Sequence, residues 1–287
     1  MDRSTTFAAL AALLAVSPAC AAPAPAWELA SGLSAPESAY VVPGKDWLVV
    51  SNVAGSPADK DGKGWLTRVS LDGKVLDERW VDGLNAPKGM RSAGGTLYVA
   101  DVDELVEVSL KSGKVLRRIK ADGAKFLNDV AVFPNGTVWV SDTMRGAIFQ
   151  LIDGKTPELA VAIESEALES PNGLYIRKGV PWIASWGPGL GPDWSTKAPG
   201  RLLAIDPRTK AIVSSSEPIG NLDGLEPDGD AWLVSDWSAG KVYRVAGGKP
   251  QLLLEGFKGA ADLGWHAKRR LLIVPRMGED RVSAFRL

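Results

Sequence analysis

The feature that most constrains this chain is a short β-rich run that recurs six times. The runs start 40 to 51 residues apart, at Trp47, Tyr98, Trp139, Trp182, Trp232 and Leu272. Each is preceded by another strand pattern and a turn pattern such as Pro134-Asn135-Gly136. The first five are followed by a third strand pattern, a further turn and a fourth strand pattern. Four strands repeated at this period indicate the blades of a β-propeller, whose repeat is about 40–50 residues long.

The sixth unit holds only three strand patterns, and the segment from Trp27 to Ala30 can supply the fourth. Addition of this N-terminal strand to the last blade would close the ring and cover sheet edges that otherwise favour aggregation. No amphipathic helix of useful length interrupts the pattern, which argues against α/β and helical-repeat folds. We therefore predict an all-β fold for residues 23–287. It is a single-domain, six-bladed β-propeller of four-stranded antiparallel blades, and an N-terminal strand closes the last blade.

Residues 1–22 have the pattern of a signal peptide. Arg3 precedes an apolar run from Phe7 to Val16, which is too short to cross a bilayer because about 20 residues are needed. The small residues around Cys20 fit a signal-peptidase site. A lipoprotein signal with an acylated Cys20 is the alternative, although Ser17 stands where such signals usually carry leucine. We expect an exported protein, periplasmic or secreted, with no transmembrane segment.

Charge and composition exclude several classes of function. The chain has 33 Lys and Arg against 34 Asp and Glu, a net charge of −1, so nucleic acid is a poor candidate partner. His266 is the only histidine and Cys20 the only cysteine, which excludes histidine pairs, cysteine clusters and, after cleavage of the leader, a thiol nucleophile. A small-molecule substrate is expected, and nothing in the sequence indicates an oligomeric state.

Two opposite blades carry about ten extra residues between their second and third strands, at 51–64 and 185–200. Long loops at one mouth of a propeller usually shape a ligand site. Trp186, Trp194 and Trp237 belong to loops on this side. Trp186 is predicted to contact substrate, although a tryptophan in a loop often packs only against its own blade.

The expected start of each first strand carries a polar residue. Counting back nine or ten residues from the six runs gives Glu37, Lys88, Asp129, Asn172, Asp223 and Asp262, with Asn128 beside Asp129. Carboxylates gathered in a channel need a counter-charge, and Ca²⁺ binds six to eight oxygen ligands. The lack of imidazole and thiolate favours Ca²⁺ or Mg²⁺ over zinc or copper. Alternatively, these are turn residues that hydrogen-bond their own backbone.

The order and spacing of these short motifs resemble the gluconolactonase/regucalcin (senescence-marker-protein-like) family of six-bladed propellers, a relative of diisopropyl-fluorophosphatase. The matching motifs are Ala35-Pro36-Glu37-Ser38, Asn128-Asp129, Pro171-Asn172-Gly173 and Asp223-Gly224. The resemblance implies a divalent metal, Ca²⁺ first, with Mg²⁺, Mn²⁺ or Zn²⁺ as alternatives. Its implied ligands are Glu37, Asn172 and Asp223, with Asn128 as a further ligand or a substrate contact.

The resemblance also implies catalytic roles for Asp129 and Asp223, as the base that activates water or as the group that attacks the substrate. Lys88 and Asp262 depart from the family pattern and are predicted to contact substrate. Lys88 would also offset the negative charge of the ring or bind an anionic group.

Two functions follow from this site. The first is an exported metal-dependent hydrolase that acts on a lactone or related ester in the central channel. The second is a non-catalytic module that binds a small molecule or a protein partner at the same mouth, and a purely structural ion is a third interpretation. The fold does not decide among them, because propellers serve all of these roles.

Overall fold

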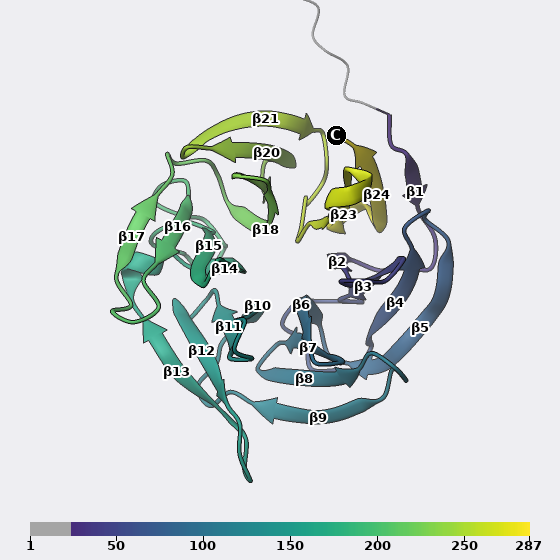
Figure 1. Cartoon of the computed structure of the whole chain (residues 1–287), viewed down its shortest axis with the longest axis horizontal. Helices are drawn as coiled ribbons and strands as arrows, with labels where there is room; N and C mark the ends of the chain where they lie inside the picture. The colour runs from purple at the N-terminus through teal and green to yellow at the C-terminus, as the bar shows by residue number, and fades with distance from the viewer. Residues whose placement is uncertain (1–23) are drawn as a thin grey trace, which may run out of the picture.

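Six four-stranded antiparallel sheets surround a central channel in the computed structural model, which describes residues 24–287 (Figure 1). The predicted signal peptide and Cys20 lie outside the described residues. Blade one contains β2 (Pro36–Val41), β3 (Trp47–Asn52), β4 (Gly64–Ser70) and β5 (Val75–Leu84). Blade two contains β6 (Pro87–Ala93), β7 (Thr96–Asp101), β8 (Glu104–Ser109) and β9 (Val115–Lys120).

The next two blades have the same strand order, from the channel outward. Blade three contains β10 (Leu127–Val132), β11 (Val138–Asp142), β12 (Ala147–Ile152) and β13 (Glu158–Glu164). Blade four contains β14 (Pro171–Arg177), β15 (Val180–Ser185), β16 (Leu202–Ile205) and β17 (Ile212–Ser215).

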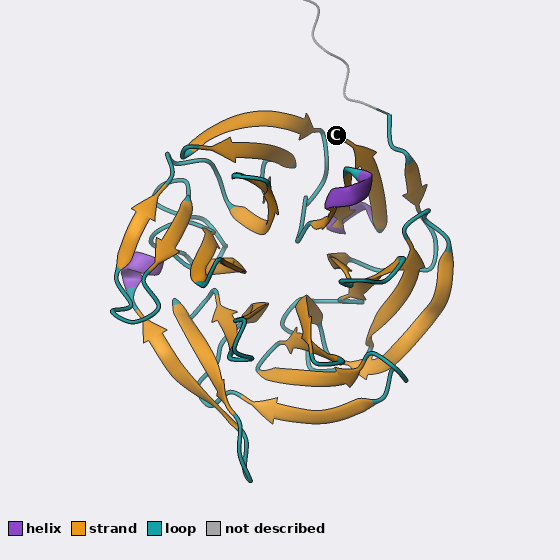
Figure 2. Ribbon diagram, in the orientation of Figure 1, coloured by secondary structure: helices purple, strands orange, loops and turns teal. Residues whose placement is uncertain are grey.

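The last two blades complete the ring. Blade five contains β18 (Leu222–Asp228), β19 (Ala231–Asp236), β20 (Lys241–Ala246) and β21 (Lys249–Glu255). Blade six contains β22 (Gly264–His266), β23 (Leu271–Arg276), β24 (Arg281–Arg286) and β1 (Trp27–Leu29). The helical segments are short 3-10 turns: η1 (Glu166–Leu168), η2 (Ala267–Arg269) and η3 (Met277–Glu279) (Figure 2). Across residues 24–287, no helix has the length and apolar character needed to span a membrane.

The predicted closure of the ring is confirmed. Strand β1 pairs antiparallel with β24, with Trp27 opposite Ala284. The indole Nε1 of Trp27 also donates a hydrogen bond to the carbonyl of Leu71 at 3.0 Å, which ties the closing strand to blade one. The first and last parts of the chain therefore share one sheet, in which β1 covers the edge of β24 and is the outer strand.

Loss of the closing tryptophan is expected to weaken the ring. The indole of Trp27 packs against the backbone of Gly73 and makes the bond to Leu71, so Trp27→Ala should lower the free energy of unfolding by about 2–3 kcal/mol. Urea denaturation measures this loss. A loss within error of zero would show that β1 contributes little to closure.

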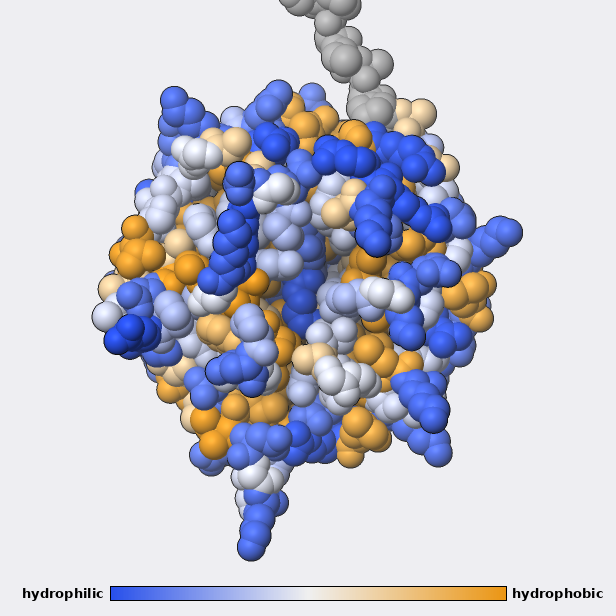
Figure 3. Space-filling view, viewed as in Figure 1, coloured by the Kyte–Doolittle hydropathy of each residue, from blue (hydrophilic) through white to orange (hydrophobic). Residues whose placement is uncertain are grey.

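The hydrophobic core lies between adjacent blades. One cluster joins Leu105 of blade two to Leu127 and Phe149 of blade three, and similar clusters fill the other junctions. Because each blade buries its faces only against its neighbours, the repeats are stable together and not singly. Hydrophilic residues gather at the centre of the ring on the face seen in Figure 3.

Acidic residues at the ends of second strands fix the segments that lead into the first strands. The Asp101 carboxylate accepts hydrogen bonds from the backbone N–H groups of Asn85 and Ala86, at 2.9 and 2.7 Å. Asp142 accepts the equivalent bonds from Lys125 and Phe126, at 2.7 and 3.0 Å. In blades two and three, these bonds hold the start of the first strand in place at one mouth of the channel.

Candidate functional site

A cavity of about 520 Å³ lies at this mouth of the channel. Five of its polar residues, here called the floor, come from the first strands of five blades: Glu37, Lys88, Asn128, Asn172 and Asp223. Each is the second residue of its strand. Aromatic side chains, here called the aromatic wall, cover much of the remaining surface: Phe126, Trp186, Trp194 and Trp237.

A β-bulge turns each floor residue toward the channel. The register of the first and second strands shifts at the floor residue in all five blades, for example between Leu127 and Val130 around Asn128. A bulge inserts an extra residue and re-aims the side chain beside it. The sequence count placed Asp129 in the ring because the hairpin of blade three is one residue longer than that of blade two: Val130 pairs with Val140, whereas the equivalent Met90 pairs with Val99.

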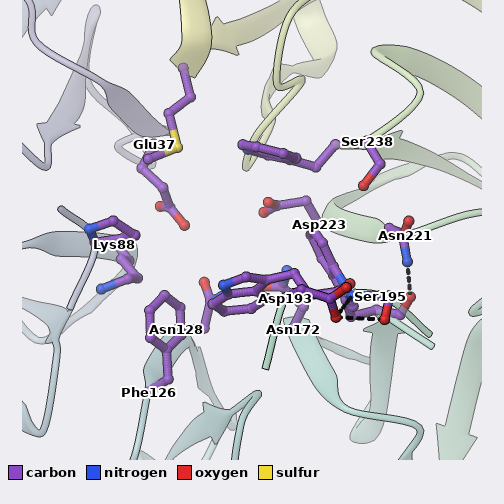
Figure 4. A pocket seen from close by; sticks show the side chains of 15 residues that line it. Glu37, Lys88, Phe126, Asn128, Asn172, Asp193, Ser195, Asn221, Asp223 and Ser238 are labelled. Carbon is purple, nitrogen blue, oxygen red and sulfur yellow. Dashed lines mark hydrogen bonds between the residues drawn. The ribbon is translucent and has the colours of Figure 1, made fainter. Parts of the chain in front are cut away.

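The oxygen atoms of the floor face one space. Figure 4 shows the carboxylates of Glu37 and Asp223 pointing toward each other, with Asn128 beside them. Glu37 Oε2 and Asn172 Oδ1 are buried and have no hydrogen-bond partner among residues 24–287. An unsatisfied buried acceptor costs about 1–3 kcal/mol, so this arrangement favours a cation or a donor from a ligand.

This donor set fits a hard divalent cation, because Ca²⁺ prefers carboxylate and amide oxygens. Within residues 24–287, no group of three or more His, Cys, Asp or Glu side chains is arranged to hold a metal ion. A cation at the floor would therefore rely on the amides of Asn128 and Asn172 as well as on the two carboxylates. The Asn128 amide is oriented by a hydrogen bond from its Nδ2 to Thr143 Oγ1 at 3.2 Å.

Burial and mutual repulsion make the floor carboxylates bind protons readily. Burial, followed by the charges of neighbouring carboxylates, raises the pKa of Glu37 and of Asp223 well above the usual range. Burial also lowers the pKa of Lys88 to about 8. The Lys88 ammonium donates a hydrogen bond to the carbonyl of Ala86 at 2.9 Å and lies 4.3 Å from the centre of the Phe126 ring.

Asp129 and Asp262 lie in the channel but do not line this cavity. Both carboxylate oxygens of Asp129 accept backbone hydrogen bonds at 2.6 Å, from Val130 and Leu174. Gly89 permits this packing, because a Cβ there would lie 2.2 Å from Asp129 Oδ1. Asp262 accepts a 2.6 Å bond from Ser38 Oγ. The catalytic role of Asp129 and the substrate contact of Asp262 stay predictions, and the structure gives neither side chain a place on the cavity surface.

The sequence count missed a buried ion pair in the channel. Arg91 Nη1 of β6 donates to Glu226 Oε1 of β18 at 2.7 Å, and the guanidinium lies between the rings of Tyr40 and Tyr175 at 5.4 and 5.1 Å. Burial raises the pKa of Glu226 to about 7, although Arg91 opposes this effect. Arg91 also lowers the pKa of Asp129 and Asp262 against the larger effect of their burial.

A signal for this pair was present in the sequence. Arg91 and Glu226 each lie three residues beyond a floor residue, Lys88 and Asp223, so they share one level of the channel. Both residues line a second cavity of about 630 Å³ at the other mouth, together with His266. Because it lines this second cavity, the single histidine lies away from the floor. Its Nδ1 accepts a hydrogen bond from the backbone N–H of Arg269 at 3.1 Å.

No protein-family model matches this sequence, and no curated protein matches it. Solved structures do resemble it in fold. A gluconolactonase from Xanthomonas campestris is 15% identical with a TM-score of 0.64, over 88% of this chain and 86% of that one. A hydrazine synthase from Kuenenia stuttgartiensis is 14% identical with a TM-score of 0.65, over 90% and 97%. A virginiamycin B lyase from Staphylococcus aureus is 12% identical with a TM-score of 0.60, over 91% and 98%. At these identities the likeness shows the fold alone.

Proposed function

We propose that this protein is an exported hydrolase that binds a divalent cation, Ca²⁺ first, and opens a lactone or related ester. The observation that carries the proposal is the set of buried acceptor oxygens on the floor, of which Glu37 Oε2 and Asn172 Oδ1 have no hydrogen-bond partner in the described part of the chain. The gluconolactonase in the fold comparison and the sequence motifs around Glu37 and Asp223 support the same chemistry.

Glu37, Asn128, Asn172 and Asp223 would hold the cation. When bound, a divalent cation polarises an ester carbonyl and stabilises the charge that develops on its oxygen. Among the side chains, Asp223 would act as general base; the projection of its carboxylate into the cavity supports this role (Figure 4). Lys88, on the same floor, would attract the carboxylate of the product.

The reaction balances with one water molecule. Asp223 removes a proton from water as the water oxygen bonds to the carbonyl carbon. The ring carbon–oxygen bond then breaks, and the proton held by Asp223 passes to the leaving alkoxide. The products are one carboxylic acid and one alcohol on the same chain, and Asp223 returns to its starting state.

Chelation tests the proposal directly. A panel of lactones and simple esters is incubated with purified protein, with and without a chelator, and then with Ca²⁺ restored. Turnover that disappears on chelation and returns with Ca²⁺ supports the proposal. The absence of metal-sensitive turnover on every compound would remove it.

The affinity for Ca²⁺ is expected to fall as the pH is lowered. The pKa values of Glu37 and Asp223 are raised in the ion-free protein, so protons compete with the cation at both carboxylates. The raised pKa of these carboxylates stabilises the folded ion-free protein at acidic pH, and this stabilisation is lost as the pH rises. The additional stability that Ca²⁺ binding gives the folded protein should therefore grow with pH. Calorimetric titration at about pH 5 and about pH 8 should give an affinity at least ~10-fold weaker at the lower pH. An unchanged affinity would argue against carboxylate ligands.

A further inference from the structure

The aromatic wall is a continuous surface built from separate segments of the chain. Trp186 and Trp194 come from the segment between β15 and β16, Phe126 precedes β10, and Trp237 follows β19. The ring of Trp194 lies 4.9 Å from that of Phe126 and 5.5 Å from that of Trp186. The rings of Trp186 and Trp237 are 5.9 Å apart. Edge-to-face and tilted contacts of this kind fix the rings against one another.

Trp194 is held in an unfavourable backbone conformation. Its φ is +65°, in the left-handed region that a bulky residue rarely adopts. Its N–H donates to the carbonyl of Gly191 at 3.1 Å, and its own carbonyl accepts a bond from Trp186 Nε1 at 3.0 Å. Strain of this kind persists where the surrounding structure enforces it and is common at sites that clamp a ligand.

Polar groups at the rim of the cavity mainly hold the loop together. Ser195 Oγ donates to Asp193 Oδ1 at 2.6 Å. Asn221 Nδ2 donates to the carbonyl of Trp186 at 2.8 Å and to Thr196 Oγ1 at 3.3 Å. These donors are engaged within the loop, so the rim offers a ligand mainly the second carboxylate oxygen of Asp193, Asn221 Oδ1 and Ser238. The aromatic wall instead offers apolar surface to the part of a ligand that lies above the floor.

We propose that the substrate carries an apolar group, an aromatic ring or a short alkyl chain, on the alcohol side of the ester. The carbonyl would lie at the floor, and the apolar group would pack against Trp194, Phe126 and Trp237. The volume of about 520 Å³ suits a small molecule of this kind. The position of the carbonyl at the floor rests on the proposed function. The contact between the apolar group and the aromatic wall does not depend on it. A polyhydroxylated sugar lactone would be a poor substrate.

A panel of matched lactones tests this preference with Ca²⁺ present. The compounds are γ-butyrolactone, γ-octalactone, dihydrocoumarin and glucono-δ-lactone. Burial of each methylene contributes about four-fold in affinity. We therefore expect kcat/KM for γ-octalactone, which has the same ring and a butyl chain added, to exceed that for γ-butyrolactone by about ten-fold or more. Dihydrocoumarin, whose phenolate is a better leaving group, tests only whether an aromatic lactone is accepted. Equal rates, or a preference for glucono-δ-lactone, would overturn the inference while leaving the proposed hydrolysis in place.

Binding without turnover gives an independent readout. The probe is 3,4-dihydro-2-quinolinone, the lactam that corresponds to dihydrocoumarin, followed by tryptophan fluorescence and calorimetry. Trp194→Gly removes the ring and relieves the positive φ, and it should weaken binding about ten-fold. Trp237→Ala carries the same test if the first variant does not fold. Trp80→Ala, on the outer strand β5, is the matched control and should bind normally.

The two hypotheses fail in different ways. If no lactone is hydrolysed but the lactam binds and Trp194→Gly weakens it, the apolar site stands and the hydrolase proposal falls. If the lactam does not bind, or if Trp194→Gly and Trp237→Ala bind it as tightly as the unaltered protein, the inference is overturned.

Discussion

Asp223→Asn is expected to lower kcat/KM for the best lactone by about 10²–10⁴-fold. The substitution keeps the size of the side chain and removes the group proposed to accept the proton of the attacking water. It also removes one of the two carboxylates proposed to hold the cation, so the affinity for Ca²⁺ should fall as well. Steady-state kinetics and calorimetric titration measure the two effects separately.

Asp230→Asn is the matched control for this experiment. Asp230 lies in the same blade, its side chain is fully exposed, and it pairs with Arg177 at the turn between β18 and β19. Its substitution should leave both kcat/KM and Ca²⁺ affinity unchanged. Full activity in Asp223→Asn would contradict the proposed mechanism. Ligand binding without turnover in the unaltered protein would favour the non-catalytic binding module.

Arg91→Met is expected to cause the largest loss of stability, about 3–5 kcal/mol in the free energy of unfolding at about pH 8. Arg91 is buried and pairs with Glu226 across the channel, and its charge also acts on Asp129 and Asp262. Removal of Arg91 leaves these buried carboxylates without their positive counter-charge, which destabilises the folded protein. Urea denaturation followed by circular dichroism measures the change.

The loss should be smaller at about pH 5 than at about pH 8. The pKa of Glu226 is about 7 with Arg91 present and would rise further without it, so at pH 5 Glu226 is protonated and needs no partner. The double variant Arg91→Met with Glu226→Leu should recover much of the loss, since an apolar pair of similar volume often replaces a buried ion pair at little cost. A loss below about 1 kcal/mol at pH 8 would show that the pair is unimportant.

The propeller could be predicted because its signals are local. A strand pattern followed by a turn can be recognised from a few adjacent residues. Each such pattern is weak evidence by itself, but six at a regular spacing together indicate a propeller. The closing strand at Trp27 could be inferred by elimination, because blade six required a fourth strand and only this segment remained. The backbone groups that Asp101 and Asp142 bind could not be predicted, because these contacts form only when the strands pair.

The floor was predicted less completely. Glu37, Lys88, Asn172 and Asp223 could be placed by counting, because these residues fall at one position in four blades. In blade three the count reached Asp129 and not Asn128, because its hairpin is one residue longer: Val130 pairs with Val140, whereas Met90 of blade two pairs with Val99. A shift of one residue exchanges the two faces of a strand, so an uncounted extra residue changes the side chain that faces the channel.

The amino-acid sequence by itself determined the repeat, the four-stranded blades and the level of the channel at which polar residues gather. Only the tertiary structure decided which of two adjacent residues faces the cavity, that Arg91 meets Glu226 135 positions away, and that aromatic rings from three segments form one wall. The physical reason is range. Turns and strand patterns depend on neighbours in the chain, whereas bulges, buried ion pairs and cavity walls depend on how the closed ring packs.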